Sequence, residues 1–201
     1  MLLVVGLGNP GPRYEATRHN AGFRIAERFA ARCAIDGWES RFAGRLGLGS
    51  LPARDSEVTR EVAVLLPGTF MNRSGAAVSR AVTGLGVADP ATDLVLAYDD
   101  VDLPFGRMRL RPGGGGGGHR GVQSVIEALG DASFARVRFG VGRPAGKRDT
   151  VEYVLEPFGM DEEDALDGLL GRAADAIEAS LREGCIAAMN RFNGPPEAEL
   201  A

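Results

Sequence analysis

Short apolar runs bounded by glycine or polar residues recur along the chain and predict buried β-strands. The clearest runs lie at residues 2–5, 61–66 and 93–98, and a further strand is predicted at residues 136–141. A segment at 42–48 alternates more weakly and also predicts a strand. Residues 107–110 alternate arginine with methionine and leucine, which is typical of a half-exposed strand at the edge of a sheet.

Between these runs, apolar residues recur at helical spacing. Helices are predicted at residues 20–33, 72–84, 121–129, 165–182 and 185–192. Asn20 stands where a side chain would cap the first of them. Loops are predicted where polar residues or glycines gather, at 7–19, 50–60 and 113–118. Residues 194–201 are expected to form a disordered tail, which leaves a single domain over 1–193.

Strands that alternate with helices predict an α/β fold, here a single-domain sandwich with a mixed, largely parallel central sheet flanked by helices. In such sheets, ligands bind beyond the carboxyl ends of the strands. Asn9, the segment 67–72 and Asp99 each follow a predicted strand. We therefore expect these three loops to meet at one edge of the sheet.

The composition is that of an ordinary globular protein. The 201 residues are 44% hydrophobic and 25% charged, which is enough for one full core. No apolar run reaches the roughly 18 to 20 residues of a membrane span, and the first residues lack the basic segment of a signal peptide. Cys33 and Cys185 are too few for a disulfide framework or a zinc site. We expect a cytoplasmic monomer with no membrane partner.

Charge is distributed unevenly along the chain. The net charge is −4, yet residues 103–150 carry nine basic and three acidic side chains, a balance of +6. The flanking segments are acidic, at −1 for residues 1–102 and −9 for residues 151–201. A basic block inside an acidic protein indicates either a local site for a polyanion or an arginine-rich face in solvent.

One motif after the first predicted strand resembles a nucleotide-binding site but lacks the context that such a site needs. Gly6, Gly8 and Gly11 match the spacing of a dinucleotide-binding fingerprint. In that fingerprint the glycines open a helix, whereas here Pro10 and Pro12 bracket the third glycine. The stretch about 20 residues on is predicted to be helical rather than a strand ending in an acidic residue. We therefore expect no nucleotide cofactor.

His19 is the strongest candidate for a general base, because the chain has only two histidines. It follows an irregular loop that begins near Asn9, and Asp99 could orient its imidazole. The apolar residues 21–23 also permit a buried histidine that only packs. The acidic stretch 99–102 could instead be a turn or, less favoured, a metal site.

In several segments the chain resembles the bacterial peptidyl-tRNA hydrolases. The motifs that carry the resemblance are the segments 6–20, 69–75, 99–106, 113–121, 138–144 and 152–158. They occur in the order and spacing of that family and cover essentially the whole chain. The resemblance implies hydrolysis of the ester between a peptide and the 3′ ribose of tRNA, with no metal and no cofactor.

The resemblance also implies roles for individual residues. His19 matches the general base and Asp99 the carboxylate that supports it, while Asn9 matches the residue that helps distinguish a peptidyl from an aminoacyl group. Contacts with the tRNA end or the peptide are implied for Tyr14, Phe70, Met71 and Asn72. Arg111 and Arg138 match basic residues for the 5′ phosphate of tRNA.

The chain departs from the family pattern at Arg120, where the family has asparagine before the last glycine of 117–121. Arginine cannot accept a hydrogen bond, and a cation beside His19 would lower the pKa of that imidazole. His119 is expected to have a packing or loop role. The six glycines 113–118 form either a flexible linker or a mobile lid. A non-hydrolytic RNA-binding relative and a small-ester hydrolase are the alternative functions.

Overall fold

A seven-stranded sheet runs through the part of the chain that the computed structural model describes, namely residues 1–52, 58–144, 146 and 148–194. The strands are β1 (Leu2–Gly6), β2 (Glu39–Arg41), β3 (Gly44–Leu51), β4 (Arg60–Pro67), β5 (Leu94–Asp100), β6 (Met108–Arg111) and β7 (Ala135–Gly140). Their order across the sheet is β2-β3-β4-β1-β5-β7-β6. The central strands β4, β1, β5 and β7 pair in parallel. The outer strands pair antiparallel. The predicted mixed, largely parallel sheet is confirmed.

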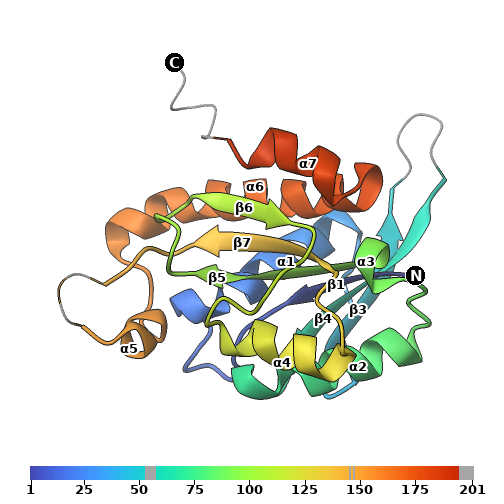
Figure 1. The fold of residues 1–201 in the computed structure, drawn as a ribbon, viewed down its shortest axis with the longest axis horizontal. Helices are drawn as coiled ribbons and strands as arrows, with labels where there is room; N and C mark the ends of the chain where they lie inside the picture. The colour runs from blue at the N-terminus through green and yellow to red at the C-terminus, as the bar shows by residue number, and fades with distance from the viewer. Residues whose placement is uncertain (53–57, 145, 147, 195–201) are drawn as a thin grey trace.

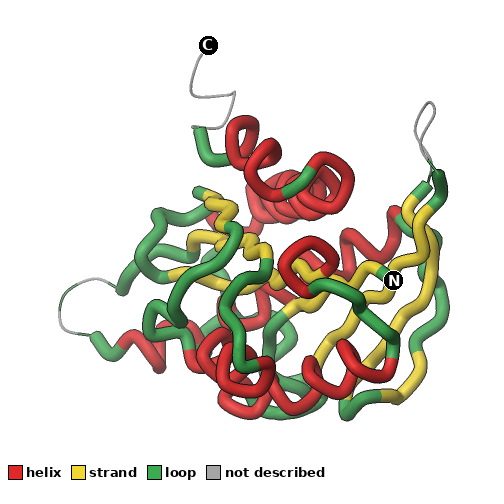
Figure 2. The backbone as a smooth tube through the Cα atoms, turned by 45° about the vertical axis from the view of Figure 1, so that its right-hand side comes forward, coloured by secondary structure: helices red, strands yellow, loops and turns green. Residues whose placement is uncertain are grey.

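Helices cover both faces of this sheet (Figures 1 and 2). They are α1 (Ala21–Arg32), α2 (Ser74–Gly84), α3 (Pro90–Asp93), α4 (Arg120–Leu129), α5 (Thr150–Val154), α6 (Met160–Glu183) and α7 (Cys185–Phe192). The 3₁₀ turns η1 (Arg18–Asn20) and η2 (Met71–Arg73) precede α1 and α2. Helices α1, α6 and α7 pack on one face, and α2 and α4 pack on the other.

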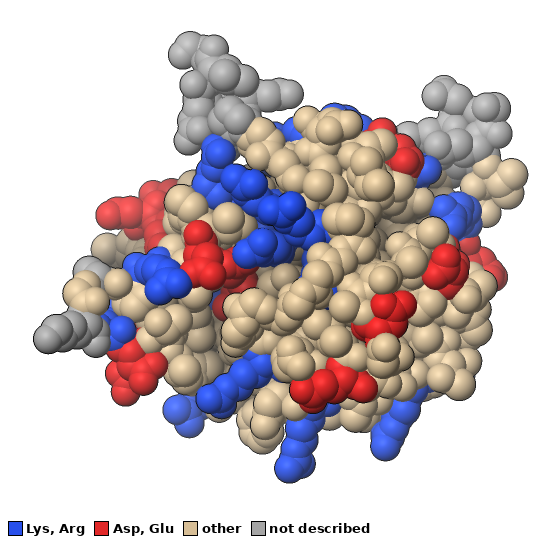
Figure 3. Space-filling view, viewed as in Figure 1, with Lys and Arg blue, Asp and Glu red and all other residues tan. Residues whose placement is uncertain are grey.

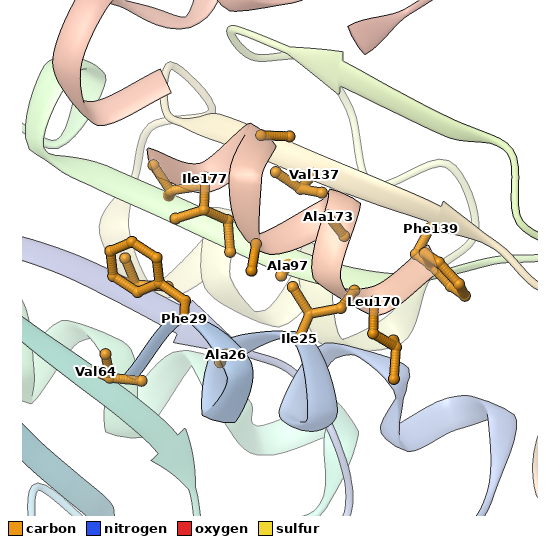
Figure 4. Packing of buried hydrophobic residues seen from close by; sticks show 14 of the residues in the cluster. Ile25, Ala26, Phe29, Val64, Ala97, Val137, Phe139, Leu170, Ala173 and Ile177 are labelled. Atoms are coloured by element: carbon orange, nitrogen blue, oxygen red, sulfur yellow. The ribbon is translucent and has the colours of Figure 1, made fainter. Parts of the chain in front are cut away.

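The core consists of two apolar layers because alternate residues of each strand point to opposite faces. In β1, Leu2 and Val4 face the α1–α6 layer, while Leu3 and Val5 face the α2–α4 layer. Figure 4 shows the first layer, where side chains of α1 and α6 meet above the strands. Strands that are covered on both faces must be apolar throughout, which explains the continuous runs seen in the sequence.

Several predicted boundaries were wrong. Phe42 and Ala43 form the β2–β3 turn, with φ of 54° and 55°, so β3 begins only at Gly44. Helix α6 begins at Met160 rather than at 165, and its first turn holds three acidic residues, which suit a helix amino end. Strand β5 includes the aspartates that were expected to follow it. Strand β2 and helices α3 and α5 were not predicted. Residues 53–57 of the predicted loop and 195–201 of the predicted tail lie outside the described residues.

The edge strand β6 is capped by a side chain from the C-terminal region. Asn193 accepts a hydrogen bond from the Leu110 N–H at 2.7 Å and donates one to the Leu110 carbonyl at 3.2 Å. The amide thus replaces a neighbouring strand and satisfies backbone groups that an edge would leave exposed. Helix α7 therefore holds β6, and the arginines on it, at a fixed position.

The topology creates a crevice above β1. Strand β1 lies between β4 and β5, so the loops that leave β4 and β5 flank the loop that leaves β1. Helix α1 packs closely beneath this point, and glycine at position 22 permits the close approach. A side chain there would collide with the carbonyl oxygens of Leu7 and Ala97. Among the described residues, no helix is both long and apolar enough to cross a membrane.

Candidate active site

A cleft of about 740 Å³ opens at the carboxyl ends of the parallel strands. It is lined by residues of the loops that follow β1, β4 and β5, by the glycine-rich loop 113–118 and by helix α5. The predicted site residues that line it are Asn9, His19, Phe70, Met71, Asn72, Asp99, Arg111, Arg120 and Arg138. The expected convergence of three loops on one edge of the sheet is therefore observed. Tyr14 is half-buried and is not among the residues that line this cleft.

His19 and Asp99 form a buried polar pair in the cleft. The imidazole Nδ1 of His19 lies 2.8 Å from Asp99 Oδ1 and 3.0 Å from Oδ2. The Asp99 side chain is 2% exposed and that of His19 is 16% exposed. An ionised carboxylate can only accept, so Nδ1 carries the proton and Nε2 keeps a free lone pair. This is the tautomer that a general base needs.

His119 makes a second hydrogen bond with the same carboxylate. Its Nδ1 accepts from the Val122 N–H at 3.2 Å and thereby caps helix α4. A backbone N–H can only donate, so the proton of the neutral ring is on Nε2, which donates to Asp99 Oδ1 at 3.1 Å. The expected packing or loop role is borne out by the cap on α4 and by the packing of the ring on Tyr98, and the hydrogen bond to Asp99 is an additional contact that was not predicted. A weak signal for this contact was present in the sequence, since His119 precedes a predicted helix directly after the glycine-rich loop.

The electrostatics of the pair favour ionisation. Burial lowers the pKa of His19, but the charge of Asp99 and its hydrogen bond outweigh burial, and the pKa lies above its ordinary value. Burial would raise the pKa of Asp99, yet the charge of His19 and the hydrogen bonds from both histidines hold it well below the usual range. Arg120 is not among the groups that shift the pKa of His19. The expected lowering by this cation was therefore wrong.

Asn20 holds the two ends of the loop that carries His19. Its Oδ1 accepts from the Asn9 N–H at 2.8 Å, and its Nδ2 donates to the Asn9 carbonyl at 3.0 Å. The predicted cap on α1 was wrong, because this side chain makes no capping hydrogen bond. Asn9 in turn accepts from the Met71 N–H at 2.9 Å through Oδ1. Asn9 therefore joins the β1 loop to η2, and its Nδ2 has no hydrogen-bond partner among the described residues.

Arg18 supports η1 from behind the cleft. The guanidinium donates to the Pro157 carbonyl at 2.7 Å and to Glu162 at 2.6 Å, and it lies 4.3 Å from the centre of the Tyr153 ring. The Arg18 N–H also donates to the Glu156 carbonyl at 3.0 Å. Sequence reasoning missed this residue, because its partners lie about 140 positions away and no local pattern marks a buried arginine.

Part of the basic block is neutralised by acids from outside it. Arg138 donates to Asp100 at 2.5 Å. Ion pairs also join Arg143 to Asp102 and Arg148 to Glu156. Arg136 is buried, and Lys147 lies outside the described residues. The count of +6 along the sequence therefore overstates the free charge. Within the described part of the block, the arginines without an ion-pair partner are the buried Arg136 and the exposed Arg109, Arg111 and Arg120.

The cleft also has an apolar wall and exposed amides. Phe70 is 58% exposed and Met71 is 5% exposed, and both line the cleft beside the exposed Asn72. Val151 of α5 lines it as well and is 52% exposed. Large apolar side chains that stay exposed in a cleft indicate contact with a ligand. An exposed amide beside them can donate to a carbonyl or accept from an N–H.

The two histidines and Asp99 are also close enough to hold a cation. Their ligand atoms lie within 4.8 Å of one another. However, the nitrogens that face Asp99 are the protonated ones, as the carboxylate and the Val122 N–H require. A metal would have to displace both protons and both hydrogen bonds. The geometry favours a hydrogen-bonded cluster around one carboxylate.

Comparison with known proteins agrees with this geometry. The family model of the peptidyl-tRNA hydrolases matches residues 3–199. A peptidyl-tRNA hydrolase of Syntrophotalea carbinolica is 45% identical over 96% of this chain and 97% of its own length. One of Synechococcus is 50% identical over 95% of this chain and 82% of its own length. The crystal structure of the Acinetobacter baumannii peptidyl-tRNA hydrolase superposes with a TM-score of 0.85 at 34% identity, over 96% of this chain and 95% of that one.

Proposed function

Because the chain belongs to the peptidyl-tRNA hydrolase family, we propose that it cleaves the ester bond between the peptide and the tRNA of peptidyl-tRNA. The observation that carries this proposal is the buried His19–Asp99 pair in a cleft with arginines at one end. The pair supplies a base for water, and the arginines supply charge for RNA. The proposed substrate is a product of translation, which favours a cytoplasmic enzyme, and we propose that it acts as a monomer.

In the proposed reaction, Nε2 of His19 removes a proton from water, and the resulting hydroxide attacks the ester carbonyl. Asp99 stabilises the imidazolium that forms, and His119 holds Asp99 in place. The bond between the carbonyl carbon and the 3′ oxygen then breaks, and the departing oxygen takes the proton from His19. The free Nδ2 of Asn9 and the amide of Asn72 are the groups that can donate to the carbonyl or bind the peptide backbone.

We assign the tRNA to the β6–β7 side of the cleft. Arg111 is exposed and lines the cleft, and Arg138 lines it while paired with Asp100. Together they suit the 5′ phosphate of the acceptor stem, since phosphate contacts position a nucleic acid without taking part in bond chemistry. Phe70 and Met71 are assigned to the peptide side or to the terminal base. Tyr14 would reach the substrate only at the rim of the cleft.

Release of tRNA from N-acetyl-aminoacyl-tRNA by the purified protein tests the function. We expect release of free tRNA, with much slower release from the matching aminoacyl-tRNA and no turnover of a small aryl ester at comparable concentration. Binding of tRNA without any hydrolysis would replace the enzyme by an RNA-binding relative. Efficient turnover of the small ester with no preference for tRNA would instead identify a general esterase.

A further inference from the structure

Arg136 is a buried cation, whereas the other arginines that the structure describes lie at least partly at the surface or form salt bridges. Its side chain is 2% exposed on β7. The guanidinium donates to the carbonyls of Gly115 at 2.7 Å and Ala132 at 3.0 Å, and also to the carbonyl of Gly114. It lies 4.6 Å from the centre of the Phe134 ring. Arg136 thus anchors the start of the glycine-rich loop from below.

Tyr98 lies between this guanidinium and the His19–Asp99–His119 cluster. Tyr98 is buried on β5, on the same face of the sheet as Arg136 on the adjacent strand β7, and both residues line the cleft. The Tyr98 ring packs on the His119 ring, with 4.9 Å between centroids. His119 donates to Asp99, and Asp99 holds His19. A set of neighbouring side chains therefore runs from the glycine-rich loop to the proposed base.

We propose that Arg136 is a positioning residue that joins the glycine-rich loop 113–118 to the His19–Asp99–His119 cluster, so that one side chain sets both the substrate wall and the orientation of the base. The kinetic side of this proposal rests on the proposed function. Arginine suits this task because its planar fork holds several acceptors in fixed directions, whereas lysine offers one point charge.

The neighbouring Arg138 shows that the strand itself does not dictate this role. The two arginines are two positions apart on β7, on the face where β6 presents Arg109 and Arg111. Arg138 is only partly buried and forms an ion pair with Asp100. Arg136 instead donates its hydrogen bonds to backbone carbonyls of loops, which bear no net charge. Replacing Arg136 should therefore disturb geometry, while replacing Arg138 should remove charge from the cleft.

Steady-state kinetics with a peptidyl-tRNA substrate provide the first test. Arg136→Lys should raise KM about tenfold and lower kcat about tenfold, the scale expected for lost hydrogen bonds to a charged group. Tyr98→Phe should lower kcat by about three- to tenfold with KM unchanged, because the ring stays on His119 and only the hydroxyl next to Arg136 is lost. In the double variant, the loss in kcat should equal that of Arg136→Lys alone, since both changes break one path.

Arg60→Lys is the matched control. Arg60 also donates to a backbone carbonyl, that of Leu181 at 2.8 Å, but it lies at the opposite end of the strands. This variant should lower the melting temperature without changing kcat or KM. Fully additive kcat losses in the double variant, or an Arg136→Lys variant that is less stable but kinetically normal, would overturn the proposed coupling. Should Arg136→Lys fail to fold, an unchanged kcat in Tyr98→Phe overturns it alone.

Histidine-selective ¹⁵N NMR supplies a readout that is independent of activity. The chain has two histidines, so the resonances of both rings can be resolved and assigned. Arg136→Lys and Tyr98→Phe should each shift the His119 Nε2 resonance and, more weakly, that of His19, while Arg60→Lys should shift neither. Unmoved histidine resonances in the first two variants would overturn the coupling, even for a protein that hydrolyses peptidyl-tRNA normally. Shifted resonances in a protein without that activity would sustain the coupling and reject the proposed function.

Discussion

The two ends of the cleft differ in how their polar groups are satisfied. At the His19 end, each ring and carboxylate is fixed by hydrogen bonds, and Asp99 alone accepts from two histidines. At the β6 end, where Figure 3 shows basic side chains gathered on the surface, Arg109 and Arg111 have no ion-pair partner among the described residues. Bond chemistry needs groups held in one geometry, whereas recognition of a phosphate needs charge that is still free.

This difference separates the expected kinetic effects. Changes at the fixed end should act mainly on kcat, because they alter the base or its orientation. Changes at the arginine end should act mainly on KM and on its dependence on salt. A change at the fixed end that acts on KM alone, or a change at the arginine end that acts on kcat alone, would contradict this division.

His19→Ala should lower kcat by about two to four orders of magnitude, the usual contribution of a general base. The fold should persist, because the ring is partly exposed and Asp99 keeps its hydrogen bond from His119. Single-turnover release of tRNA, measured beside thermal unfolding, checks both expectations. Near-native hydrolysis by a folded variant would remove His19 from the mechanism.

Asp99→Asn should lower kcat about 10- to 100-fold, because the base loses its anionic support and its fixed tautomer. In the wild type, Asp99 raises the pKa of His19, so the acidic limb of the pH–rate profile should lie above the ordinary imidazole value. Removing the charge leaves burial to lower the pKa, and the limb should move to lower pH. Asp102→Asn is the control, since the Asp102 carboxylate forms an ion pair with the exposed Arg143 and is not among the groups that shift the pKa of His19. An unmoved limb in Asp99→Asn would mean that the carboxylate does not act on the base.

The double change Arg111→Ala with Arg138→Ala should raise KM about tenfold and alter kcat little. The slope of the logarithm of the tRNA binding constant against the logarithm of salt concentration should become shallower by about one to two, which corresponds to the loss of one to two phosphate contacts. Arg41→Ala with Arg80→Ala is the control, because Arg41 lies on β2 at the opposite edge of the sheet and both side chains are exposed. Titration of tRNA binding at several salt concentrations gives the slope. Equal slopes for the two double variants would exclude the β6–β7 arginines as the tRNA contact.

Arg120→Asn should have the smallest effect, a change of about two- to fivefold in kcat/KM. Arg120 is exposed at the first turn of α4 and does not contribute to the pKa of His19. The acidic limb of the pH–rate profile should therefore stay in place. A moved limb would show that the cation reaches the imidazole when substrate is bound.

Much of the fold could be predicted because β1 and most of β4 and β5 are covered on both faces and therefore form apolar runs. The convergence of Asn9, Met71 and Asp99 followed from the rule that loops meet at the carboxyl ends of such strands. Short elements were missed, since α3 and α5 have too few residues to show a period. The turn at Phe42 was missed because two non-glycine residues adopt a positive φ there.

The network around the site could not be predicted, because its contacts join distant segments. Arg18 reaches Glu162, and Arg136 reaches the carbonyl groups of a loop some 20 residues earlier. A count of charges along the chain treats Arg136 and Arg111 alike, although burial makes one a structural anchor and leaves the other in solvent. The partners that neutralise Arg138 and Arg143 lie just outside the basic block, so only the fold reveals the smaller free charge.

The most direct test of the proposed role of His19 combines its NMR titration with the pH dependence of kcat. With two histidines in the chain, the pKa of each ring can be measured separately. We predict that the His19 pKa lies above the ordinary value of about 6.5 and coincides with the acidic limb of kcat, and that both fall together in Asp99→Asn. An acidic limb that stays in place while the His19 pKa shifts would contradict the assignment of His19 as the general base.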